Sequence, residues 1–297
     1  MHDRIAIFVY IHYFGSPHSR GILGKIFASI LSSNLWERVE RIQLVVTGDP
    51  LYFPSLKTLL TLYPKLQISI NSLWSNGAEV QTLAMIRSQC QGFPADALVA
   101  YFHTKGAVNY TQINIDWLSY MIDYNIGCWP KAVNCLSCDG YDIYGASWCY
   151  ADFSFDPSCT HLHGKRNGHY QGNFWWASCD YILKLDPPRD SCCRYEAETW
   201  IGLAEPRFYN AMCAPYSLTL ASFTRSQYGE YHKHFSQDFV SVELPRPLID
   251  RIKMLYPGQF SHDIDNLTFD ENRAGISWSA ASFDLASAIA LMLELND

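Results

Sequence analysis

Residues 5–12, IAIFVYIH, form a near-continuous apolar run, which is typical of a strand buried on both faces of a parallel sheet. Similar runs follow at residues 42–47 (IQLVVT), 66–71 (LQISIN) and 97–103 (ALVAYFH). Helical patterns lie between these runs, over residues 21–35, 54–62 and 79–89. Strands that alternate with helices in this way predict an α/β fold with a Rossmann-like, mostly parallel central sheet flanked by helices.

Polar residues follow several of the predicted strands. They are His12-Tyr13-Phe14 after the first strand, Asn76-Gly77-Ala78-Glu79 after the third, and His103-Thr104-Lys105-Gly106 after the fourth. Because ligands of such sheets bind beyond the carboxyl ends of the strands, these clusters predict a binding site at one edge of the sheet.

Two later stretches, GHYQGNFWWA at residues 168–177 and RYEAETWIG at 194–202, combine aromatic, amide and carboxylate side chains. Apolar faces of a sugar ring pack on indole, and its hydroxyls bond to polar groups around it. Residues 170–177 are predicted as one strand. On that strand Trp175 would share a face with Asn173 and meet a ligand, while Trp176 would be core. A plain strand with core aromatics, followed by an acidic helix, is the alternative.

The stretch 147–168 is rich in Cys, His, Asp and Gly and is predicted as a long irregular loop. Loops of this length are usually functional or mobile, so a lid over a ligand site and a simple insertion are both open. Beyond residue 215 no motif is recognised, and we expect an extension that packs on the main domain or contacts another subunit.

Composition limits the classes of function. The net charge is -7 and no long Lys/Arg tract occurs, so the usual electrostatic footprint for nucleic acid or anionic membranes is missing. No signal peptide and no apolar run of about 20 residues is recognised. We therefore expect a cytoplasmic protein without a transmembrane segment.

The 10 cysteines lie between Cys90 and Cys213. Without a secretory signal, free buried thiols are the expected state. A zinc protein is an alternative, with Cys135, Cys138, Cys159 and either His161 or His163 as ligands, although the spacing fits no closed-site pattern well.

The motifs YFHTKG (101–106), HYQGNFWWA (169–177), RYEAETWIG (194–202) and NGAE (76–79) together resemble a family of glycosyltransferases. This family has the GT-A fold and occurs in bacterial polysaccharide clusters and in large DNA viruses of algae. The resemblance covers roughly residues 5–209. It implies a GT-A-like domain over residues 1–215, followed by a C-terminal extension, 216–297. It also implies transfer of a sugar from a nucleotide-diphosphate sugar to a hydroxyl of a glycan acceptor.

Site residues follow from this reading as hypotheses. The donor would meet Tyr13 (or Phe14), Asn76, Gly77, Glu79, His103, Thr104 and Lys105. The sugar and acceptor would meet His169, Gly172, Asn173, Trp175, Trp176 and Arg194. Glu198 would be the general base, with Glu196 in reserve. If both are helical they point about 160–200° apart and should not share one site.

The sequence departs from many GT-A enzymes in one respect. The slot that often holds Asp-x-Asp with Mn²⁺ or Mg²⁺ contains His103-Thr104-Lys105. Either Lys105 neutralises the diphosphate directly, or a metal is held by other carboxylates such as Asp152 or Asp156. A non-catalytic protein that binds nucleotide sugars or carbohydrates on the same fold is the alternative function.

Overall fold

The computed structural model describes residues 5–70, 78–104, 106, 111–151, 153, 156–164, 167–189, 193 and 195–211. Several of the predictions above lie outside these residues: those for Asn76, Gly77, Lys105, Asp152, Arg194 and the extension 216–297.

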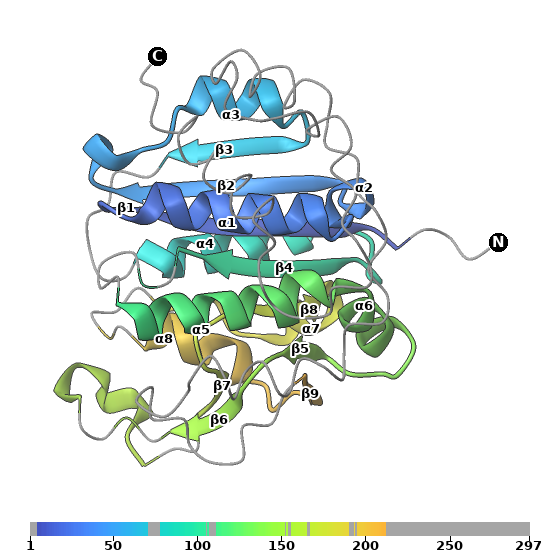
Figure 1. The fold of residues 1–297 in the computed structure, drawn as a ribbon. Helices are drawn as coiled ribbons and strands as arrows, with labels where there is room; N and C mark the ends of the chain where they lie inside the picture. Colours follow the sequence, from blue (N-terminus) through green and yellow to red (C-terminus); the bar gives the residue numbers. More distant parts are fainter. Residues whose placement is uncertain are drawn as a thin grey trace.

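The described residues form a 7-stranded sheet with the order β3-β2-β1-β4-β8-β5-β9 (Figure 1). Four parallel strands make up one side of it: β1 (Ile7–Gly15), β2 (Arg41–Gly48), β3 (Leu66–Ile70) and β4 (Leu98–His103). The next strand, β8 (Trp175–Ser178), is antiparallel to both β4 and β5 (Ile143–Gly145), and β9 (Phe208–Asn210) is parallel to β5. The predicted α/β fold with a Rossmann-like, mostly parallel sheet is confirmed.

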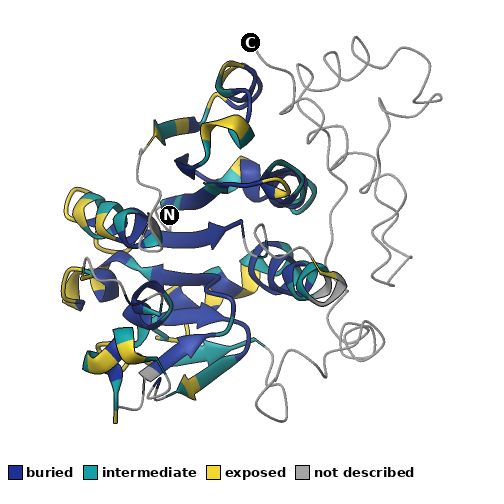
Figure 2. Ribbon diagram, turned by 90° about the vertical axis from the view of Figure 1, so that its left-hand side faces the viewer, coloured by how far each residue is buried: buried dark blue, intermediate teal, exposed yellow. Residues whose placement is uncertain are grey.

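Helices cover both faces of this sheet (Figure 2). One face carries α1 (Ser19–Ser32), α2 (Leu35–Arg38), α5 (Gln112–Ile122), the π-helical turn η2 (Asp123–Gly127) and α6 (Trp129–Ser137). The opposite face carries α4 (Ala78–Cys90), α7 (Cys179–Lys184), α8 (Glu196–Thr199) and the 3₁₀ turn η4 (Trp200–Gly202). The turn η1 (Pro50–Tyr52) and α3 (Leu56–Leu62) lie between β2 and β3.

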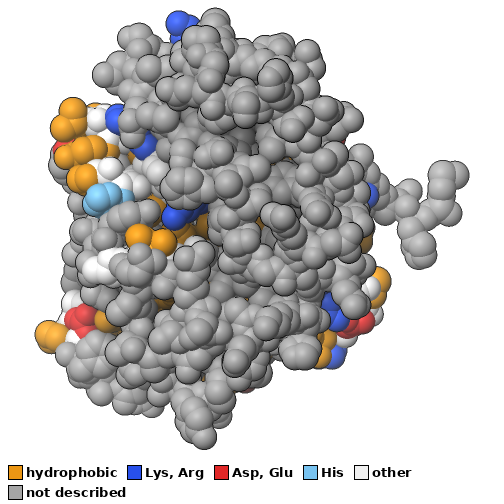
Figure 3. All heavy atoms as spheres, viewed as in Figure 1, with side chains coloured by type: hydrophobic (Ala, Val, Ile, Leu, Met, Phe, Trp, Pro, Cys, Tyr) orange, Lys and Arg blue, Asp and Glu red, His pale blue; other side chains and the backbone are white. Residues whose placement is uncertain are grey.

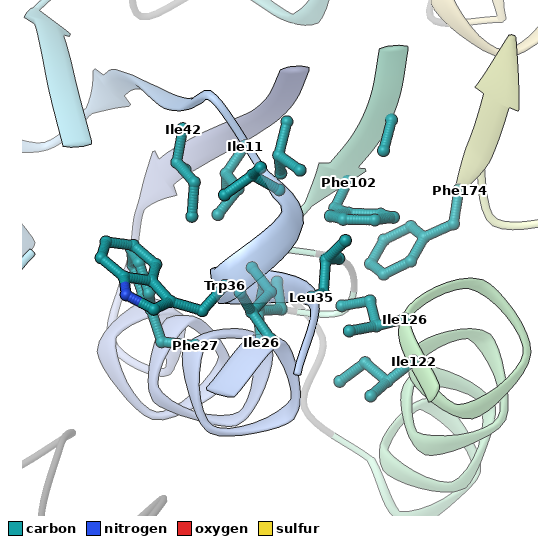
Figure 4. Packing of buried hydrophobic residues seen from close by; sticks show 14 of the residues in the cluster. Ile11, Ile26, Phe27, Leu35, Trp36, Ile42, Phe102, Ile122, Ile126 and Phe174 are labelled. Atoms are coloured by element: carbon teal, nitrogen blue, oxygen red, sulfur yellow. The ribbon is translucent and has the colours of Figure 1, made fainter. Parts of the chain in front are cut away.

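The side chains of β1 show why the first part of this strand is apolar. Ile7, Val9 and Ile11 belong to the core beneath α1, whereas Tyr10 belongs to the core beneath α4. Because neighbours on a strand point to opposite faces, a strand covered by helices on both faces is apolar on both, and a polar residue there, such as His12, needs a polar partner. Figure 4 shows the α1 side, where Ile11 and Phe102 of the sheet face side chains from α1, α2, α5 and η2.

The prediction of an irregular loop over residues 147–168 is wrong. This stretch contains β6 (Trp148–Ala151), the 3₁₀ segment η3 (Pro157–Leu162) and the start of β7 (Asn167–Tyr170). β6 and β7 form a separate antiparallel ribbon in which Cys149 lies opposite His169. Each strand has 4 residues, too few to show a reliable alternation, so only their pairing defines them.

The cysteines differ from expectation at one point. Cys159 and Cys193 form a disulfide with a Cα–Cα distance of 4.9 Å, so the expectation of free thiols is wrong for this pair. Because the sulfur of Cys159 is in a disulfide, Cys159 cannot serve as one of the zinc ligands considered above. Within the described residues, no group of three or more His, Cys, Asp or Glu side chains could hold a metal ion. The described part of the chain also contains no helix that is long and apolar enough to cross a membrane.

The π-helical turn η2 contains an acid whose charge is suppressed by its surroundings. Asp123 begins this turn, and its Oδ2 atom is shielded from solvent. Burial raises the pKa of Asp123 to about 8, whereas an unfolded chain has an Asp pKa of about 3.9. Between these two values the folded protein holds a proton that the unfolded chain has lost, so the free energy of unfolding falls as the pH rises.

We therefore expect Asp123→Asn to flatten the pH dependence of stability. The wild type should lose up to about 1.4 kcal/mol per pH unit from this group between about pH 4 and 8, and the variant should not. Urea unfolding at pH 5, 6, 7 and 8 measures both slopes, with the exposed Asp96→Asn as the control. Equal slopes for wild type and Asp123→Asn would contradict this assignment.

Candidate functional site

The carboxylate of Glu79, in the first turn of α4, joins side chains from distant parts of the chain. Its Oε2 accepts hydrogen bonds from the Tyr101 hydroxyl at 2.9 Å and from Asn173 Nδ2 at 3.0 Å. Its Oε1 lies 3.1 Å from His103 Nδ1. Tyr101 and His103 lie at the carboxyl end of β4, and Asn173 precedes β8. We call Glu79, Tyr101, His103 and Asn173 the Glu79 cluster.

Both ring nitrogens of His103 have a partner. Its Nε2 lies 2.8 Å from the Gly172 carbonyl oxygen, which can only accept, so Nε2 is the donor of this bond. Its Nδ1 lies 3.1 Å from Glu79 Oε1. These two contacts hold the imidazole between the turn before β8 and the first turn of α4.

Tyr101 is a buried donor to the Glu79 carboxylate. Burial raises the pKa of its hydroxyl well above the usual range, and the charges of Glu79 and Glu198 raise it further. Glu198 lies on α8, which packs against α4, the helix that carries Glu79.

Exposure distinguishes the members that a ligand can reach. The side chain of Glu79 is 28% exposed and that of His103 is 9% exposed. Beneath them Tyr101 packs on Trp175 with ring centroids 5.2 Å apart, and both are fully buried. The indole nitrogen of Trp175 donates to Asn173 Oδ1 at 3.0 Å. The Glu79 carboxylate is thus a partly exposed hydrogen-bond acceptor that lies over the packed rings of Tyr101 and Trp175.

His12 and Thr104 join the ends of β1 and β4 at the same edge. His12 lies opposite His103 in the strand register, and its Nδ1 is 2.9 Å from the Thr82 hydroxyl of α4. Burial lowers the pKa of His12 to about 4, so it is neutral at physiological pH. The Thr104 hydroxyl, which was predicted to face the diphosphate, accepts a hydrogen bond from the Phe14 amide at 3.0 Å. This bond joins the ends of β1 and β4.

Two residues with positive φ shape the turn that presents Asn173. The Asn173 amide donates to the Tyr170 carbonyl at 3.0 Å, and φ is +88° at Gly172 and 55° at Asn173. Glycine suits the third position of such a turn, and asparagine tolerates the left-handed region. A Cβ on Gly172 would lie 2.0 Å from Met121 Sδ.

The structure corrects the prediction for Tyr13. This residue is fully buried in the core beneath α1, and its hydroxyl donates to the Tyr52 carbonyl. Phe14, the alternative considered, is half-buried at the end of β1. Alternation along the strand explains the difference, because Tyr13 shares the face of Ile11 and Phe14 does not.

The predictions for the tryptophans need a similar correction. Trp175 and Trp176 do belong to different cores on the two faces of the sheet. However, both are fully buried, and Trp176 donates to the Asn125 carbonyl at 2.8 Å. Trp175 therefore supports the site without lining it. The predicted single strand is interrupted at the Gly172 turn, so Asn173 and Trp175 are not successive same-face positions of one strand.

The remaining predicted residues fall into separate groups. His169 lies on the β6–β7 ribbon, with Nε2 3.4 Å from Cys149 Sγ. Glu196 is buried and bonds His161 Nε2 at 2.5 Å, whereas the charge of Glu198 acts on Tyr101 and Cys149. The two glutamates thus have different partners. The role proposed for Glu196 as a reserve base is weakened because its carboxylate is already used.

Tyr101 and His12 lie in stretches singled out from the sequence, but neither was given a role of its own, although a signal for each exists. Tyr101 lies two residues before His103, so the alternation of β4 puts both on one face. His12 ends a strand that is otherwise apolar. A polar residue at the carboxyl end of a buried strand usually has a polar partner, here Thr82 of α4.

The carboxylates that could hold a metal ion at this edge have protein partners. Both oxygens of Glu79 contact side chains of the cluster. Asp156, one of the suggested metal ligands, caps η3 by accepting from the Ser158 amide at 2.9 Å. In Figure 3, hydrophobic side chains, a histidine and Lys or Arg side chains lie on the left, where β1 and β2 end in the same view in Figure 1.

No protein-family model matches the chain, and no curated protein matches its sequence. Among solved structures, it is similar to 4-diphosphocytidyl-2C-methyl-D-erythritol synthase from Anaerococcus prevotii, with 10% identity, a TM-score of 0.34 and coverage of 61% of this chain and 74% of that one. It is also similar to HddC from Yersinia pseudotuberculosis, with 13% identity, a TM-score of 0.37 and coverage of 69% and 89%. At these scores the likenesses carry no argument about activity.

Substitution by alanine is expected to have opposite effects on stability at Gly172, in the turn, and at Gly21, in α1. Gly172→Ala should destabilise the protein by about 1–3 kcal/mol, because it combines a left-handed backbone with an overpacked neighbour. Gly21→Ala, in α1 with nothing within 4 Å of its Cβ position, should stabilise by about 0.5–1 kcal/mol. Urea unfolding measures both changes. A neutral Gly172→Ala would show that the turn is not fixed as described.

Proposed function

We propose that the chain is a glycosyltransferase that moves a sugar from a nucleotide-diphosphate sugar to a hydroxyl of a glycan acceptor, with inversion. The observation that carries this proposal is the Glu79 cluster at the carboxyl edge of the sheet. One carboxylate is held there as a fixed acceptor for hydroxyl groups, and α8, which carries Glu198, packs against the helix of Glu79. The resemblance of the motifs that contain Tyr101, Asn173 and Glu198 to one glycosyltransferase family supports the same activity.

In this proposal the donor lies beyond the ends of β1 and β3. Phe14, half-buried there, is beside the base, and Glu79 accepts hydrogen bonds from hydroxyls of the ribose or the sugar. Negative charge builds up on the leaving diphosphate, so a fixed cation stabilises the transition state more than the ground state. Lys105, assigned from its place in the sequence, supplies this charge, or Mn²⁺ or Mg²⁺ does.

Glu198 is the general base of the proposed reaction. It removes the proton of the acceptor hydroxyl as that oxygen attacks the anomeric carbon, and the bond to the diphosphate breaks on the opposite face. Glu79 Oε2 accepts from Tyr101 and Asn173 and its Oε1 lies beside His103, which suits binding better than proton transfer. Tyr101, kept protonated by burial, is a neutral donor to Glu79.

Glu198→Gln should lower kcat by about 10²–10⁴-fold, because the amide cannot accept the proton. Donor binding should change less than about threefold, since the amide keeps the size and polarity of the side chain. Release of nucleoside diphosphate with acceptor present measures kcat, and calorimetry measures donor binding. The exposed Glu40→Gln is the control. Full activity of Glu198→Gln would exclude this residue as the base.

The same experiment separates the alternative function. A non-catalytic nucleotide-sugar or carbohydrate-binding protein would bind the ligand but release no nucleotide in the wild type, with or without acceptor. The buried, satisfied cluster around Glu79 is compatible with binding alone, so turnover by the wild type is the deciding observation.

A further inference from the structure

The 3₁₀ segment η3 is attached to the start of α8 by two links. The first is the disulfide between Cys159 and Cys193. The second is the contact between His161 Nε2 and Glu196 Oε2, at 2.5 Å. Both begin within η3 and end at or just before the first turn of α8, so they act on the same short helix.

The disulfide is shielded from water and the second link is partly exposed. Cys159 and Cys193 are 0% and 1% exposed, and they pack with Phe153 in a small apolar cluster. The side chain of Glu196 is 4% exposed and that of His161 is 23% exposed. Glu196 Oε1 also accepts from the Arg189 amide at 3.3 Å. Removing one partner of a buried carboxylate is destabilising, so the contact with His161 helps to fix the position of the first residue of α8.

The helix α8 depends on such contacts for its position. It has 4 residues, far below the length at which a helix is stable alone. On the sheet side it is anchored by Trp200, which is fully buried and donates to the Asp186 carbonyl at 2.8 Å. This anchor is independent of η3. Loss of the η3 links should therefore leave the sheet folded while the first turn of α8 gains freedom.

We infer that the Cys159–Cys193 disulfide and His161 are positioning elements for Glu198, which lies on α8 two residues after Glu196. This inference rests on the proposed function only in giving Glu198 the role of base. The links hold the turn that carries Glu198, and this turn packs against α4 and shares a core with Tyr101 through Ala197, so the links hold Glu198 on the side of the sheet that carries the Glu79 cluster. Neither link includes a residue of the Glu79 cluster, so we expect their loss to leave donor binding unchanged.

The first test needs no substrate. Peptide mapping without reductant should recover Cys159 and Cys193 in one linked peptide. Hydrogen exchange of the intact protein should then show faster exchange of the amides of residues 195–202, by tenfold or more, in the Cys159→Ser/Cys193→Ser double variant. The amides of β1, β2 and β4 should exchange as in wild type. Cys138→Ser, at an exposed free cysteine, is the control and should change neither region.

The second test uses turnover. The double variant should lower kcat at least tenfold while the donor KM changes less than threefold, because the base is misplaced and the donor site is intact. If the double variant does not fold, His161→Ala with the disulfide intact should show the same split with a smaller loss. Glu196→Gln, which can still bond His161, should retain more activity than His161→Ala.

The outcomes separate this inference from the proposed function. A missing linked peptide or unchanged exchange in residues 195–202 would overturn the inference, whatever the activity. Faster exchange with wild-type kcat would also overturn it. If exchange changes as expected but the wild type transfers no sugar, then the links hold α8 as inferred and the proposed function is the part that fails.

Discussion

The carboxylate of Glu79 is the interaction on which the rest of the site depends. It holds the first turn of α4, the end of β4 and the turn before β8 in one arrangement, through Tyr101, His103 and Asn173. Hydrogen bonds to a charged group contribute about 1.5–3 kcal/mol each when they are formed. Asn173 bonds Glu79 from a left-handed turn, so the backbone before β8 and the polar network support each other.

The charges around this network favour some ligands over others. Burial keeps His12 neutral, and the Glu79 carboxylate accepts hydrogen bonds from Tyr101 and Asn173. An acceptor of this kind suits sugar hydroxyls, which donate hydrogen bonds, whereas a diphosphate requires positive charge. In the proposed mechanism, the choice between Lys105 and a divalent cation therefore matters more than the identity of the sugar.

Much of the fold follows from the sequence, since strands buried on both faces are mostly apolar, and residues 5–12, 42–47 and 97–103 are apolar except at His12, Gln43, Thr47 and His103. The position of the polar cluster follows from the same rule, because parallel strands end at one edge. Other features depend on tertiary contacts. The face that Tyr13 occupies depends on the register of β1. The burial of Trp175 depends on a turn that interrupts the predicted strand. The β6–β7 ribbon and the disulfide exist only through partners distant in sequence.

The central claim is that Glu79 receives a nucleotide sugar, and thermal unfolding of wild type and Glu79→Gln with a panel of nucleotide sugars tests it most directly. Each sugar is tested with and without Mn²⁺, because a ligand stabilises the state that binds it. We predict that at least one nucleotide sugar raises the Tm of the wild type and raises that of Glu79→Gln much less. If no nucleotide sugar raises the Tm of the wild type, or if both proteins respond equally, the claim is contradicted.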